Sequence, residues 1–153
     1  MENTDIIITG STAVWHMPLT QGDTLGSYSG RFEFRCFLSP TQMLEAGRLY
    51  RELVGNLGAL CSESDSNLAF CLSQLKFRIL RAPPFWQSSL SESGLCGDIP
   101  DLNVLAQILD KSILSETMFK EKMAKEREAV LNRAIKVGED LLHTDSGGDD
   151  GNL

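Results

Sequence analysis

The feature that most constrains the fold is an unbroken helical pattern from Asp101 to about Leu142. Asp101 is a candidate N-cap, because a short side-chain oxygen can accept a hydrogen bond from the first turn. A helix of this length spans about 60 Å at 1.5 Å per residue, which is more than one small domain can cover. We therefore expect either a break near Ser112–Ser115 or an extension that packs against something else.

Two apolar stripes divide this helical pattern. The second stripe is narrow and lies among many charges, as in helices that pair with another helix. Folding back onto the chain's own body is an equal alternative. The predicted organisation is an α+β domain over residues 1–114, a helical extension over 115–142 and a disordered acidic tail over 143–153. The first stripe contains Leu102, Leu105, Leu109 and Ile113, and the second contains Phe119, Met123, Val130, Ala134, Val137 and Leu141.

The beginning of the chain has the pattern of antiparallel strands. We predict strands over 5–10, 13–19 and 31–38, separated by a turn-prone stretch. In the third strand, aromatic and polar residues alternate with period two, which is typical of a strand with one buried face. Phe37 interrupts the polar face, so we expect it to cover a neighbouring element or to contact a partner. The buried set is Phe32, Phe34, Cys36 and Leu38.

The strands are followed by helices with clear start signals. Ser39, Pro40 and Gln42 predict a capping box that opens a helix ending near Leu57. A second, centrally buried helix is predicted over 68–82, capped by Asp65 or Ser66, although 75–79 also alternates like a strand. The predicted fold is thus α+β, with two or three N-terminal antiparallel strands and then three helices, the last long and charged.

The helix over 68–82 is expected to end at Pro83 and Pro84, because a proline disfavours the helical conformation of the residue before it. Phe85 and Trp86 then lie on a stiffened loop, ahead of a Ser/Gly-rich loop over 87–97. They either pin this loop onto the core or act as an anchor in a partner's pocket, since rigid aromatic residues are common hot spots.

Charge and composition argue against several partners. The formal net charge is -7 and the basic residues are scattered, whereas nucleic-acid binding normally needs a basic stripe. No apolar run approaches the length of a membrane span, so no membrane partner is expected. No signal peptide is apparent, so we expect the protein to be cytoplasmic at synthesis. Cys36, Cys61, Cys71 and Cys96 contain no closely spaced pair, which predicts reduced thiols and no metal site.

We found no motif that builds a catalytic site. GxSxG, Walker, GxGxxG and HExxH patterns do not occur. His16 lies in a strand-like run without a nucleophile pattern beside it, and Asp101 is better explained as a helix cap. We therefore expect no enzymatic activity, no cofactor and no small-molecule substrate. A hydrolase that uses a Ser or Cys nucleophile is the remaining enzymatic alternative.

The order of these landmarks resembles small morphogenesis proteins of tailed phages, particularly tail assembly chaperones and related minor virion proteins. The resemblance covers about residues 28–125 and has four motifs of low specificity. It implies a non-enzymatic protein that holds apolar surfaces of tail components, or a virion component whose strands complete a neighbour's sheet. The motifs are Gly30–Phe34, Ser39–Thr41, Arg81–Trp86 and Asp101–Leu105.

The resemblance also implies the partners and the location. Other phage structural proteins, or further copies of the chain, are the expected partners, in the host cytoplasm at synthesis or in the virion. The alternative hypothesis is a small host-directed regulator that inhibits a bacterial protein by mimicking a natural ligand with its acidic surface and helical arm.

Overall fold

The computed structural model describes residues 5–24, 26–90 and 101–151, the last nine of these by their backbone alone. The chain forms two compact units, with the boundary between Met118 and Phe119. The predicted loop over 91–97, together with Cys96, lies outside the described residues. The first unit contains the sheet and most of the helices.

The first unit is built on an antiparallel sheet with strand order β1-β2-β3-β4. This confirms the α+β class with three N-terminal strands, to which a fourth strand from later in the chain is added. The additional strand, β4, lies in the segment that the sequence assigned to the end of a helix, and Ile79 pairs with Phe34 of β3. The strands are β1 Ile6–Thr9, β2 Thr12–Gln21, β3 Ser27–Arg35 and β4 Ile79–Arg81.

Local chemistry explains the turns of the sheet. Gly10 connects β1 to β2 with a φ of 61°, a conformation that favours glycine. Pro18 lies where the β2–β3 register shifts, and a proline is tolerated there because its missing N–H breaks no regular pair. Gly30 has a φ of 141°, and a Cβ at this position would overlap the ring of Pro83.

One face of the sheet carries the core of the unit. The rings of Trp15 and Phe32 stack with centroids 5.7 Å apart, and Phe34 stacks on both. Phe32, Phe34, Cys36 and Leu38 are all buried, which confirms the predicted alternation, although β3 ends at Arg35. Phe37 follows the strand and is 44% exposed.

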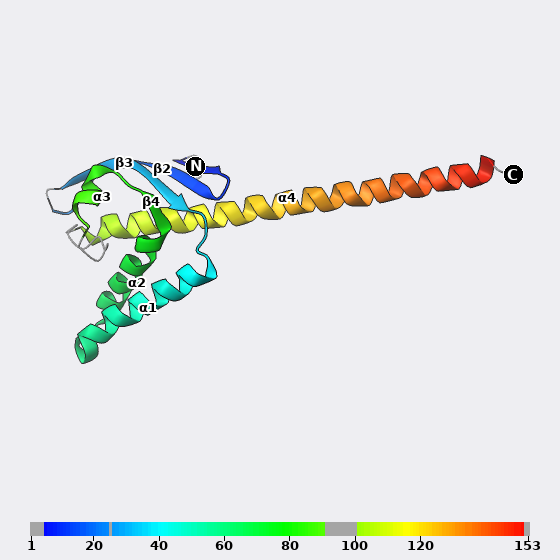
Figure 1. Cartoon of the computed structure of the whole chain (residues 1–153). Coiled ribbons are helices and arrows are strands. Elements are labelled where there is room, and N and C mark those ends of the chain that lie inside the picture. Colours follow the sequence, from blue (N-terminus) through cyan, green and yellow to red (C-terminus); the bar gives the residue numbers. More distant parts are fainter. Residues whose placement is uncertain (1–4, 25, 91–100, 152–153) are drawn as a thin grey trace. The chain divides into compact units, whose positions relative to one another are not determined.

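The first two helices form a hairpin, in which α1 Pro40–Leu57 lies beside α2 Glu63–Arg78 (Figure 1). The capping box of Ser39 and Gln42 is present as predicted. The prediction for α2 was wrong at both ends, because Ser62 caps the helix in a second capping box with Asp65. The short 3-10 turn η2 Gly58–Leu60 connects the two helices, and the short helix α3 Pro84–Ser88 follows β4.

The last helix, α4 Leu102–Gly151, contributes its first turns to the core of the first unit. The ammonium of Lys111 lies 5.8 Å from the ring centroid of Trp15, so this part of α4 packs under the sheet. The predicted stripe was partly wrong, because Leu102 and Ile113 are exposed. The buried set is Val104, Leu105, Ile108, Leu109, Ser112 and Ser115.

The helix does not break at Ser112–Ser115. Both serines are fully buried, and Ser115 Oγ donates to the Lys111 carbonyl at 2.8 Å. Such a bond satisfies the hydroxyl of Ser115 inside a helix, whereas the buried hydroxyl of Ser112 has no hydrogen-bond partner within the described part of the chain. The predicted break of the long helical pattern near Ser112–Ser115 was therefore wrong.

The second unit begins at Phe119 and consists of the rest of α4. The backbone remains helical to Gly151, beyond Leu142 where the sequence pattern ends and where a disordered tail was expected. The composition of residues 143–151 does not explain why the helix continues, because this segment contains two adjacent glycines and glycine has a low helix propensity. Residues 152 and 153 lie outside the described part of the chain.

Candidate functional site

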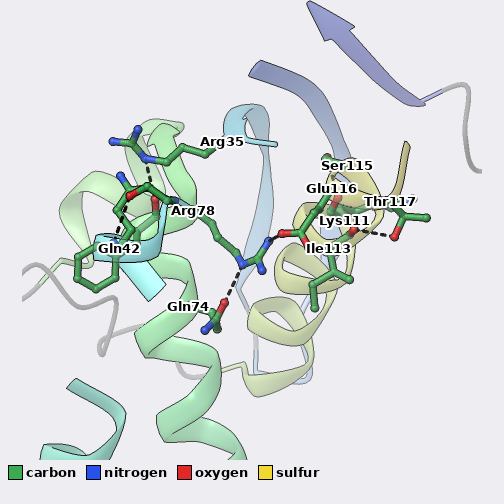
Figure 2. A network of polar contacts seen from close by, with 11 residues as sticks. Arg35, Gln42, Gln74, Arg78, Lys111, Ile113, Ser115, Glu116 and Thr117 are labelled. Atoms are coloured by element: carbon green, nitrogen blue, oxygen red, sulfur yellow. Dashed lines mark hydrogen bonds and ion pairs between the residues drawn. The ribbon is translucent and has the colours of Figure 1, made fainter. Parts of the chain in front are cut away.

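A polar cluster in the first unit surrounds Arg78, as Figure 2 shows. Its guanidinium donates to Gln74 Oε1 at 2.9 Å and lies 3.2 Å from Glu116 Oε1. Arg35 Nε donates at 2.9 Å to the carbonyl of Phe77, near the end of α2. The cluster joins α2 to β3 and α4, and Arg78 is only 8% exposed. Nη1 of Arg78 forms the ion pair with Glu116 without hydrogen-bond geometry, so the cluster links the three elements mainly through charge and through the hydrogen bonds of the two other nitrogens, Nε of Arg78 and Nε of Arg35.

A second buried cluster centres on Asp101. Its carboxylate accepts hydrogen bonds from Tyr28 Oη at 2.6 Å and from Thr24 N and Oγ1, both at 2.9 Å. The Tyr28 bond first, and then the Thr24 amide, hold the pKa of Asp101 below its usual value. The same bond and burial raise the pKa of Tyr28. Asp101 immediately precedes α4 as predicted, and its side chain also binds the β2–β3 turn to the start of this helix.

The described residues contain no assembled catalytic group. Among them, no cluster of three His, Cys, Asp or Glu side chains could hold a metal ion. His16 is exposed on β2, where it pairs with Arg31. Cys71 is buried, its thiol donates to the Leu105 carbonyl at 3.7 Å, and burial together with Asp110 raises its pKa to about 11. A thiol in that state is a poor nucleophile.

Phe85 and Trp86, which were predicted as possible contacts to a partner, pack instead against the core of the first unit. Both lie on α3, where their rings approach Phe32 edge-on with centroids 6.0 Å and 5.9 Å away. Phe85 also packs on Tyr28, and Trp86 is 4% exposed. This is the core-pinning alternative, and it leaves Trp86 little surface to offer to a partner.

The largest exposed apolar surface on the described part of the second unit runs along α4. Its large side chains are between 51% and 69% exposed. We call this surface the apolar face and divide it into two stripes. The first stripe contains Val130, Ala134, Val137 and Leu141, and the second contains Leu131, Ile135, Gly138 and Leu142. Phe119 and Met123 continue the first stripe toward the unit boundary and are partly buried.

The sequence prediction located only the first stripe and took the surface to be narrow. The second stripe was missed, although its residues repeat at intervals of four and three in the same way. A search for a second repeat offset by one residue would have found it, because adjacent residues are rotated by about 100° around the helix axis. The apolar face is therefore about twice as wide as expected.

A smaller apolar groove lies on the helical hairpin of the first unit. Its sides come from α1 and α2, and Asp65 lies at its edge. Phe70 and Leu60 are also exposed on this hairpin. The apolar lining consists of Leu53, Leu57, Leu68, Ala69 and Leu72.

Comparisons with known proteins give no identification. A scan against models of protein families and searches of curated proteins and solved structures found no match. Within the described ranges, no helix is long and apolar enough to cross a membrane.

Proposed function

We propose that the protein is a non-enzymatic assembly or minor structural protein of a tailed phage, which acts by binding other proteins through the apolar face. The observation that supports this proposal is the exposure of both stripes on a helix that is the only element in the described part of its unit. Most of the stability of a helix in a protein comes from packing of its apolar side rather than from the intrinsic propensity of its residues. Contiguous exposed apolar surface of this kind marks a site of protein contact.

The proposal assigns no catalytic residue, cofactor or nucleic-acid ligand. It places the chain in the host cytoplasm at synthesis, and in the virion when the partner is a virion component. The partner is then another phage structural protein or a further copy of the chain.

A truncation tests this proposal, and the structure defines where to cut. Ending the chain at Leu114 would remove Ser115, which is fully buried, and Glu116, which pairs with Arg78. A chain that ends at Met118 keeps both. We expect the full chain to form a complex in light scattering, or to capture a phage structural protein from infected cells, and the shorter chain to do neither.

A matched pair of variants identifies the surface responsible. Val137→Lys places a charge on the apolar face, whereas Ala129→Lys adds the same charge to the opposite, exposed side of the helix. We expect the first variant to lose the complex and the second to keep it. Capture of a host regulatory protein, with the phage partner absent, would instead favour the host-directed alternative.

A further inference from the structure

We propose that the apolar face packs against the same face of at least two other copies of this chain, in a parallel bundle of three or more helices. The inference rests on the proposed function, because it names the partner of the surface that the function uses. Three observations support it: the width of the face, its small central residues and the charges along its two edges.

The width of the face requires more than one neighbouring helix. The two stripes are about 100° apart around the helix, since each residue of the second follows one of the first. A two-stranded coiled coil covers a single seam of positions a and d. A helix with one partner would therefore leave the other stripe in water, whereas a helix with two neighbours buries both.

The centre of the face is suited to close contact between helices. Ala134 and Gly138 lie one turn apart, between the larger side chains of the two stripes. No atom lies within 4 Å of where a Cβ of Gly138 would be. Large side chains of a neighbouring helix can therefore enter this strip at Ala134 and Gly138, whereas Arg127 occupies the same strip about two turns earlier.

The charges beside the face favour a parallel copy of the same helix as the occupant. The edge next to the second stripe is acidic, with Glu121, Glu128 and Glu139. The edge next to the first stripe is mixed and includes Lys122 and Arg133 together with Glu126 and Asp140. An antiparallel copy would bring the acidic edge against itself. In a parallel ring, the acidic edge of each copy meets the mixed edge of the next, as flanking charges do in coiled coils.

The oligomeric state of the full chain tests the number of neighbours. We expect sedimentation equilibrium to give a trimer or larger assembly. Val137→Lys in the first stripe and Ile135→Lys in the second should each weaken association by about 100-fold, because each buries an unpaired charge. Ala129→Lys should leave it unchanged. Lysine is a good helix former, so circular dichroism should show that all three variants keep their helix.

A charge exchange tests the orientation. Arg133→Glu should weaken association by about threefold to tenfold, the effect of an exposed ion pair that is repeated around the ring. The double variant R133E/E139R should restore it, because in a parallel ring these two positions face each other on neighbouring copies. An unrestored double variant would overturn the parallel arrangement.

The remaining outcomes separate this inference from the proposed function. A dimer that responds to Val137→Lys but not to Ile135→Lys would overturn the two-neighbour arrangement while the face remained a binding surface. A chain that stays monomeric, yet captures a phage structural protein through the face, would overturn self-association alone. A monomer whose face variants change no binding at all would overturn both.

Discussion

The ion pair between Arg78 and Glu116 gives a quantitative test of how the first unit is held together. Arg78 lies in the core with a side chain that is 10% exposed, and its charge is opposed by Glu116 at 3.2 Å. Glu116→Gln keeps the shape and one oxygen acceptor but removes the negative charge. The arginine then remains buried without a counter-charge, which is unfavourable.

The expected loss of stability follows from the exposure of the two side chains. Removing one partner of a fully buried pair costs about 3–5 kcal/mol. Glu116 is 23% exposed, so water reaches part of the site and reduces the penalty. We therefore expect the free energy of unfolding to fall by about 2 kcal/mol, which lowers the Tm by about 8 °C for a unit of this size.

Tryptophan fluorescence during urea unfolding is a suitable assay. The two tryptophans of the chain, Trp15 and Trp86, are both buried in the first unit. Glu45→Gln, on the exposed side of α1, is the matched control and should change stability by less than about 0.5 kcal/mol. Equal effects of the two variants would refute the reasoning. Adding Arg78→Met to Glu116→Gln should recover part of the loss, because the buried charge is gone.

Three further predictions follow from individual residues. The hydrogen bonds to Asp101 lower its pKa in the folded state, so their contribution to stability is complete above the unfolded value of about 3.9 and is lost as the pH falls through the folded value. Asp101→Asn should therefore flatten the decline of stability below pH of about 4 in acid titrations, and an unchanged slope would contradict this. Cys71, with its pKa raised to about 11, should react with iodoacetamide far more slowly than the more accessible Cys61, as peptide mass spectrometry can measure. Gly30→Ala should lower the Tm because of its positive φ and close neighbour, whereas Gly55→Ala, which has open space in α1, should hold or raise it.

Local signals in the sequence determined much of the first unit. The start of α1 was predictable because its capping box involves residues three apart, which interact in any context where the helix forms. The buried side of β3 was predictable from alternation, since Phe32 and Phe34 must lie on the same side of an extended chain. The long final helix followed from its period and its charge pattern.

Tertiary structure decided what those signals left open. Residues 75–79 have a pattern that fits a helix or a strand, and it is the available edge of β3 that makes the chain a strand from Ile79 to Arg81. Asp101 lies at the position of a helix cap, but its carboxylate accepts hydrogen bonds from Thr24 in the β2–β3 turn and from Tyr28 in β3. The same limit applies to the apolar face of α4. Its residues can be read from the sequence, but how many neighbours cover it depends on packing between helices, which no local spacing specifies.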